Sequence, residues 1–158
     1  MRVFSPATVL ILCIGQPLRA QVEVALHAGA ASSLKTSSVE VGALVAVRSA
    51  ARLGLRLEVA YPASLDLLWV GACLTTIRSP RAAPQAYAVL GLGAVIPNGG
   101  AASGGGPARA AFSAGFGLRT LLVSPISGLA ELRGFWESGS DSVEMPFLSA
   151  RAGIQWRL

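Results

Sequence analysis

The sequence predicts an all-β protein, an eight-stranded antiparallel up-and-down transmembrane β-barrel, and three observations lead to this prediction. The chain is hydrophobic, yet it has no uninterrupted apolar stretch long enough for a membrane-spanning helix. Turn-forming residues divide it into eight segments in which apolar and polar residues alternate with the period of a β-strand. The last segment keeps this alternation up to the carboxyl terminus.

The composition is unusual for a water-soluble domain. Charged residues make up 13% of the 158 residues, against about 25% in a typical soluble domain. The mean hydropathy is +0.58, and the cationic residues are twelve arginines and one lysine. Besides a helix, only a closed barrel satisfies every backbone polar group in lipid. The pI of 10.2 could suggest nucleic-acid binding, but the arginines are scattered along the expected strands, which argues against that partner.

Residues 1–20 have the features of a secretory signal peptide. Arg2 supplies the charged start, residues 7–15 form an apolar run too short to cross a bilayer, and Ala20 precedes the expected cleavage site. A lipoprotein signal ending at Cys13 is disfavoured, because bulky Leu12 occupies a position that normally holds a small residue. We therefore expect a signal peptide at 1–20 and one β-barrel domain at 21–158.

The expected strands cover residues 21–30, 38–48, 52–61, 66–78, 84–96, 109–122, 127–137 and 147–158. Each reaches or slightly exceeds the roughly 9–11 residues that a tilted strand needs to cross a bilayer. Compact connections at 49–51, 79–83 and 123–126 alternate with connections at 31–37, 62–64, 97–108 and 138–146, most of which are longer. Transmembrane barrels alternate short periplasmic turns with longer extracellular loops, so both termini of an eight-stranded barrel would lie on the periplasmic side.

Most of these segments have one apolar and one polar face, whereas 66–78 carries apolar residues on both. Alternation alone does not decide which face is inside, because a soluble lipocalin-like barrel would turn its apolar face inward. Polar faces rich in glycine, the near absence of lysine and the presence of both charge signs favour a polar interior. The interior of an eight-stranded barrel just holds its side chains, so charges there must be matched. The polar faces include Glu23, His27, Glu40, Arg48, Arg52, Arg56, Glu58, Glu131, Arg133 and Glu137.

The register of the expected strands predicts neighbours within this interior. The chain is folded about Pro125 to join the sixth and seventh strands, and the last strand is closed onto the first. The expected neighbours are Arg119 with Glu131, Arg157 with Glu23, and His27 with Arg151. Tyr61 and Trp136 would lie near the outer membrane interface and Trp156 near the inner one, as aromatic girdles require.

The last eight residues match the C-terminal assembly signal of bacterial outer-membrane β-barrels. Its slots are a polar residue, a glycine two positions on, an aromatic or apolar residue three further and an apolar or aromatic terminus, filled here by Arg151, Gly153, Trp156 and Leu158. The whole of 21–158 resembles the small OmpA/OmpX-type outer-membrane barrel proteins, and 115–119 followed by 129–133 looks like their penultimate hairpin. The resemblance implies an outer-membrane β-barrel domain that contacts outer-membrane lipids. It also implies that the barrel-assembly machinery recognises the C-terminal strand.

His27 is the one histidine and therefore the obvious candidate for catalysis. Some barrels of this size resemble the chain and modify lipid A with a histidine and serine or acidic partners, and Ser32 and Ser33 follow His27. The local sequence lacks their His-x-Ser motif, so a polar lumen residue is the simpler interpretation. Cys73 is expected to be a small packed residue, and neither residue has further ligands at metal spacing. The glycines at 91, 93 and 99–106 lack the ending of a phosphate-binding loop.

We therefore expect a protein of the bacterial outer membrane, exported through a cleaved signal peptide. It would be a monomeric structural or surface-interaction module with a side-chain-filled polar lumen, and not an enzyme. We predict no catalytic, cofactor-binding or metal-binding residue, no cofactor and no nucleic-acid partner. Two alternatives remain: a lipid A-modifying outer-membrane enzyme centred on His27, and a soluble periplasmic lipocalin-like binding barrel with the strand faces reversed.

Overall fold

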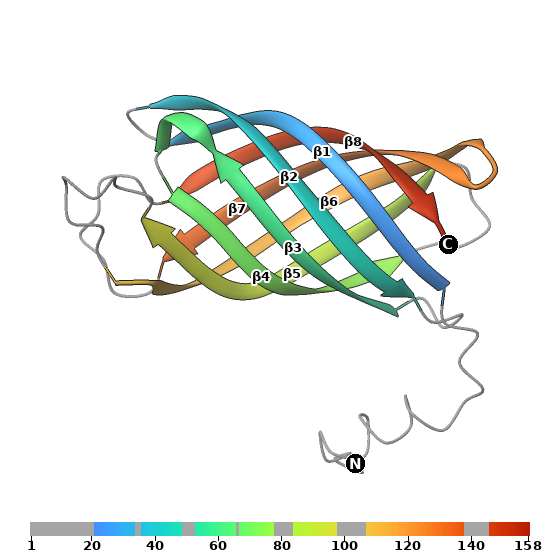
Figure 1. The fold of residues 1–158 in the computed structure, drawn as a ribbon, viewed down its shortest axis with the longest axis horizontal. Coiled ribbons are helices and arrows are strands. Elements are labelled where there is room, and N and C mark those ends of the chain that lie inside the picture. Colours follow the sequence, from blue (N-terminus) through green and yellow to red (C-terminus); the bar gives the residue numbers. More distant parts are fainter. Residues whose placement is uncertain are drawn as a thin grey trace, which may run out of the picture.

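The computed structural model describes residues 21–33, 36–48, 53–65, 67–77, 84–97, 107–137 and 146–158. These residues form eight β-strands and a short 3-10 helix, η1, at Ala63–Leu65 (Figure 1). The strands are β1 (Gln21–Ser33), β2 (Ser37–Arg48), β3 (Leu53–Pro62), β4 (Leu67–Ile77), β5 (Gln85–Pro97), β6 (Arg109–Val123), β7 (Ile126–Glu137) and β8 (Phe147–Arg157).

The strands close into one antiparallel barrel. Each pairs with its neighbours in sequence, and β8 pairs with β1 from Glu23 opposite Arg157 to Ser33 opposite Phe147. The predicted fold class and the predicted strand positions are confirmed. The predicted loop at 31–37 is wrong, because β1 continues to Ser33 and β2 already begins at Ser37, opposite Ser32.

The two ends of the barrel differ in what they carry. β1 begins and β8 ends at the same end, which we call the terminal end (Figure 1). The turn at Ser124 and Pro125 between β6 and β7 also lies there, whereas η1 lies at the opposite end. The expected connections at 49–51 and 79–83 fall outside the described residues, as do most of those at 97–108 and 138–146.

The outward faces of the strands are apolar and the inward faces are largely polar. Leu57, Leu92 and Phe116 point outward and are 61%, 73% and 64% exposed. Glu58 and Arg133 point inward and are 2% and 0% exposed. The predicted polar interior is therefore confirmed, and the reversed arrangement of a soluble lipocalin-like barrel is wrong for this chain.

An apolar cluster fills the lumen toward the opposite end, and it resolves the ambiguity of the fourth segment. Leu67 and Trp69 of β4 point inward and are buried, whereas Val70 is exposed on the outer face. Phe135 stacks on Phe147 with ring centroids 4.5 Å apart, and the Trp69 ring meets Phe135 edge-on at 5.2 Å. The apolar cluster consists of Ala31, Ala60, Leu65, Leu67, Trp69, Val95, Ala111, Phe135 and Phe147.

The predicted pairing of Arg119 with Glu131 is wrong. Arg119 lies opposite Leu129, and Glu131 lies opposite Gly117. The turn is centred between Ser124 and Pro125, and the register shifts again between Leu121 and Val123. Together these displace the pairing by two residues, which keeps every side chain on its predicted face because the strand period is two. Arg119 therefore stays in the lumen but lies nearer the terminal end.

Candidate functional site

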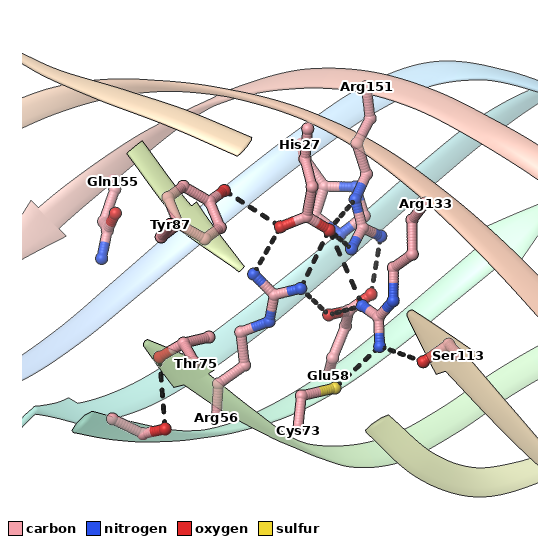
Figure 2. A network of polar contacts seen from close by, with 12 residues as sticks. His27, Arg56, Glu58, Cys73, Thr75, Tyr87, Ser113, Arg133, Arg151 and Gln155 are labelled. Atoms are coloured by element: carbon pink, nitrogen blue, oxygen red, sulfur yellow. Dashed lines mark hydrogen bonds and ion pairs between the residues drawn. The ribbon is translucent and has the colours of Figure 1, made fainter. Parts of the chain in front are cut away.

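Six charged side chains meet in the middle of the lumen, and we call them the central cluster. They come from β2, β3, β7 and β8, and each is at most 4% exposed. Three carboxylates face three guanidinium groups, so the formal charges cancel. Buried ion pairs are tolerated only when such matching offsets their desolvation. The members are Glu40, Arg56, Glu58, Glu131, Arg133 and Arg151. Figure 2 labels Arg56, Glu58, Arg133 and Arg151.

Glu131 lies at the centre of this cluster. The Arg56 guanidinium binds it with two hydrogen bonds, from Nη1 to Oε2 at 2.8 Å and from Nη2 to Oε1 at 3.0 Å. Arg151 donates to Oε1 through Nε at 3.0 Å and through Nη2, while the Tyr87 hydroxyl donates to Oε2 at 2.9 Å. Two-pronged arginine–carboxylate pairs are among the strongest charge-assisted contacts in proteins. Glu131 therefore links β3, β5 and β8 to its own strand β7.

Glu58 and Arg133 join the central cluster to the apolar cluster. Arg133 Nη1 donates to Glu58 Oε2 at 2.7 Å, and Arg151 Nη1 donates to Glu58 Oε1 at 2.6 Å. The second terminal nitrogen of Arg133, Nη2, contacts Ser113 Oγ at 2.6 Å and Cys73 Sγ at 2.8 Å (Figure 2). The Arg133 guanidinium carbon also lies 5.0 Å from the Phe135 ring centroid, within cation–π range.

A second polar group, the terminal cluster, occupies the lumen at the terminal end. Its centre is Glu23, which is 1% exposed. Arg119 Nη1 donates to Glu23 Oε1 at 2.7 Å, and Gln155 Nε2 donates to Oε2 at 2.6 Å. Arg48 Nη2 lies 3.2 Å from Oε2, and Arg157 is paired opposite Glu23 in the strand register, as predicted. The terminal cluster consists of Glu23, Arg48, Arg119, Gln155 and Arg157.

His27 lies inside the lumen, in the strand row next to Arg151, as the register predicts. Its Nδ1 is 3.8 Å from Glu40 Oε1, and its ring lies over Gly42, so that a Cβ at Gly42 would meet Nε2 at 2.5 Å. The Ser32 hydroxyl contacts Ser33 O and Ser37 Oγ near the opposite end and does not contact the histidine. The structure therefore places His27 in the polar lumen network and not in a serine–histidine pair.

The other residues considered from the sequence occupy structural positions. Cys73 is fully buried and free, as expected of a small packed residue, and its sulfur accepts from Arg133. Gly91 lies in β5, where a Cβ would come within 2.6 Å of Arg133 Nη2 and of Ser113 Oγ. Residues 99–106 lie outside the described residues. The described ranges hold no group of three histidine, cysteine or acidic side chains arranged for a metal ion.

Aromatic residues on the outer face lie where girdles would require them. Tyr61 and Trp136 are near the opposite end of the barrel and Trp156 is near the terminal end. Trp136 stacks on Phe112, with ring centroids 5.1 Å apart. Sequence analysis missed the inward aromatic residues, because Phe135 and Phe147 were not placed on a face and Tyr87 was not considered. Phe135, Phe147 and Tyr87 lie an even number of positions from Arg133, Arg151 and Gly91 on the same strands. Because a strand has a period of two, this spacing could have placed them on the inward face.

Comparison with known proteins supports the fold. No protein-family model matches the sequence, and no curated protein matches it. Among solved structures, the N-terminal β-barrel domain of Pseudomonas aeruginosa OprF matches with a TM-score of 0.66 and 14% identity, over 89% of this chain and 100% of that one. Neisserial surface protein A matches with a TM-score of 0.61 and 14% identity, over 88% and 97% of the chains. A de novo designed transmembrane β-barrel matches with a TM-score of 0.56 and 16% identity, over 87% and 95%.

The chain thus has the fold of the small eight-stranded outer-membrane barrels, and the resemblance inferred from the sequence is confirmed at the level of fold. Identities this low carry no information about ligands or activity. Within the described residues, no helix is long and apolar enough to cross a membrane.

Proposed function

We propose that the protein is a membrane-spanning β-barrel of a bacterial outer membrane and serves as a structural or surface-interaction module without enzymatic activity. One observation carries this proposal: the barrel is apolar outside and charged inside. A chain in water gains free energy by hiding Leu57, Leu92 and Phe116, yet here they are exposed all around the barrel wall. A surrounding bilayer removes that cost, because its hydrocarbon core is the apolar phase that these side chains need.

The side-chain contacts in the lumen support the proposal that the protein has no enzymatic activity. Its central carboxylates are engaged by guanidinium groups, and the Tyr87 hydroxyl is engaged by Glu131. His27 Nδ1 lies 3.8 Å from Glu40 Oε1, and the Ser32 hydroxyl contacts Ser37 rather than the histidine. These residues neutralise and position one another, which is what a filled structural lumen requires. The fit to a filled lumen favours a structural module over a wide pore or a lipid A-modifying enzyme.

We further propose that the chain inserts as a monomer, and that the barrel-assembly machinery recognises β8. β8 completes the barrel, and its end is held on both sides: Arg157 N donates to Pro125 O at 3.1 Å, and Leu158 N donates to Val22 O at 2.9 Å. The assembly signal thus coincides with the strand segment that closes the sheet. Recognition of this segment would couple insertion to closure.

Brominated lipids test the membrane proposal, because bromine quenches tryptophan only on contact. Three variants would each retain one tryptophan, with the other two changed to phenylalanine. We expect strong quenching when Trp136 or Trp156 is retained, since both lie on the outer face near the barrel ends. Trp69 is fully buried in the lumen and serves as the internal control, with little quenching expected. Equal quenching of all three, or quenching of Trp69 alone, would contradict the proposed orientation.

The enzymatic alternative has a separate test. Lipid A from cells producing the protein is compared by mass spectrometry with lipid A from cells producing the His27→Ala variant and from cells lacking the protein. The proposal predicts identical lipid A in all three. An acyl-chain change that depends on His27 would overturn the non-enzymatic assignment and leave the fold intact.

A further inference from the structure

The central cluster and the terminal cluster differ in net charge. In the central cluster, three arginines face three glutamates. In the terminal cluster, Arg48 and Arg119 share one side-chain carboxylate, that of Glu23, and Arg157 lies opposite Glu23 in the strand register. Arg48 lies opposite Gln21 and Arg157 lies opposite Glu23, two residues further along β1, so Arg48 and Arg157 are on the same face of the sheet at this end. The terminal end of the lumen therefore carries an excess of positive charge that the described side chains do not neutralise.

Residues on the remaining strands at this end do not supply the missing negative charge. Thr75 of β4 donates to Gly54 O, and Ser127 of β7 and Gln85 of β5 are neutral. The carboxylate of Glu131 belongs to the next layer of the lumen, where Arg56 and Arg151 engage it. Among the described inward residues at this end, Glu23 is thus the one acidic side chain, and its two oxygens are shared among three donors.

The cluster is both shielded and accessible. The side chains of Arg119 and Arg48 are 9% and 16% exposed, while Arg157 is exposed at the rim. Partial burial strengthens an electrostatic contact, because less solvent screens it than at an open surface. Guanidinium groups also match the oxygens of a phosphate with paired hydrogen bonds. Arg157 is thus the exposed member of the three arginines, and Arg48 and Arg119 retain partial solvent exposure.

We propose that the terminal cluster is an anion-binding site for a phosphate group, held by Arg48, Arg119 and Arg157 at the terminal mouth of the lumen. Two sources share this chemistry: soluble phosphate, and the headgroup of an anionic phospholipid beside the barrel rim. The site depends only on the arrangement of the lumen. The lipid source rests in addition on the proposed membrane location.

Calorimetric titration of inorganic phosphate into the purified barrel, in zwitterionic detergent at low salt, tests the site. The protein is purified from membranes of expressing cells. Arg48→Gln should weaken phosphate binding by about tenfold, the equivalent of one charge-assisted hydrogen bond. Arg109→Gln is the matched control: it removes the same charge at the opposite end, where Arg109 pairs with Glu137, and should leave affinity unchanged. Added salt should weaken binding to the wild-type protein.

Glu23→Gln gives the opposite result and separates binding from folding. This variant removes the carboxylate that competes with phosphate, so affinity should rise. Heat-dependent mobility on SDS gels shows whether each variant is folded. If Glu23→Gln does not fold, the comparison of Arg48→Gln with Arg109→Gln still decides. No phosphate binding, binding that Arg48→Gln leaves unchanged, or equal losses in the Arg48→Gln and Arg109→Gln variants would overturn the proposal.

Nanodiscs distinguish the two sources. The barrel is placed in phosphatidylcholine discs with or without phosphatidylglycerol, and the phosphate titration is repeated. If a headgroup occupies the site, phosphatidylglycerol should weaken phosphate binding, and the double variant Arg48→Gln/Arg119→Gln should bind no phosphate in either disc. If the site takes soluble phosphate, both discs should give equal affinity. A barrel that binds phosphate in detergent but does not enter discs would support the site and contradict the membrane location.

Discussion

Glu131 holds the middle of the lumen together, because side chains from three other strands reach its two oxygens. Its loss would leave Arg56 and Arg151 close together in a desolvated space. Breaking a buried pair by removing one partner is costly, since the remaining charge keeps its desolvation penalty. The ion pair between Arg109 and Glu137 should contribute less to stability, because the arginine side chain is 40% exposed and solvent screens the pair.

Glu131→Gln should therefore lower the free energy of unfolding by about 3–5 kcal/mol. Glu137→Gln is the matched control and should cost about 1 kcal/mol or less, because its partner is solvated. Urea unfolding of the refolded barrel in lipid vesicles, followed by tryptophan fluorescence, measures both. Equal losses in the two variants would show that the central cluster contributes no more than an exposed ion pair.

Gly117 permits the contact between Tyr87 and Glu131. A Cβ at this position would meet the Tyr87 ring, with its hydroxyl oxygen at 2.5 Å and Ala130 O at 2.7 Å. Gly117→Ala should displace the ring and destabilise the barrel by about 1–3 kcal/mol. At Gly128 a Cβ would lie 3.5 Å from Leu122, an ordinary contact, so Gly128→Ala should be tolerated. The same unfolding assay compares them, and a Gly117→Ala variant as stable as Gly128→Ala would refute the close packing.

The lumen contacts show where sequence reasoning stopped. Strand periodicity predicted the inward face of Arg56, Arg119 and Glu131 correctly. It did not predict that Arg56 meets Glu131 or that Arg119 meets Glu23, because these partners lie on strands that do not pair with each other. Sequence patterns indicate neighbours along a hairpin, whereas contacts across the lumen depend on closure and stagger of the whole barrel.

At the scale of the element, each strand alternates between inward and outward residues, and the proposed membrane location requires the outward residues to be apolar. β5 illustrates this, since Leu90 and Leu92 point outward near its middle and are 63% and 73% exposed. The sequence predicted most strand ends closely, because turn residues mark them. It missed the extension of β1 from residue 30 to Ser33 and the start of β2 at Ser37, because alanine and serine occur both in strands and in loops.

Leu92→Arg should destabilise the membrane-inserted barrel by about 2–4 kcal/mol, since its charge would lie near the middle of the bilayer. Leu53→Arg, at the first residue of β3, should cost roughly 0–1 kcal/mol, because its charge would reach the interface. Unfolding in vesicles measures the difference. Two equally small effects would indicate that water, not lipid, covers this face.

Deletion of residues 156–158 should block membrane insertion, because it removes the hydrogen bonds by which Arg157 and Leu158 join β8 to the chain at Pro125 and Val22. Replacement of the same three residues by alanine keeps the backbone and removes the side chains of the assembly signal. Cell fractionation and immunoblotting measure the inserted protein. Loss in both variants would assign recognition to the side chains, whereas normal membrane levels of the deleted chain would contradict the proposed signal.

At the scale of the whole molecule, the side chains of the lumen form three layers between the two ends of the barrel. The apolar cluster lies toward the opposite end, the balanced central cluster in the middle, and the basic terminal cluster beside the chain ends. The outer wall is apolar along all eight strands. The sequence predicted the barrel and its polar interior because composition, period and the terminal octet agree. It did not predict the layers, which depend on the stagger between strands.

The measurement that tests the central claim most directly is fractionation of expressing cells, followed by SDS gel electrophoresis of the membrane fraction with and without boiling. A closed, membrane-embedded barrel should be found in the outer membrane and should resist detergent until heated, so that boiling changes its mobility. A soluble periplasmic protein whose mobility does not change on boiling would contradict the account, since the exposed apolar wall would then have no lipid to cover it.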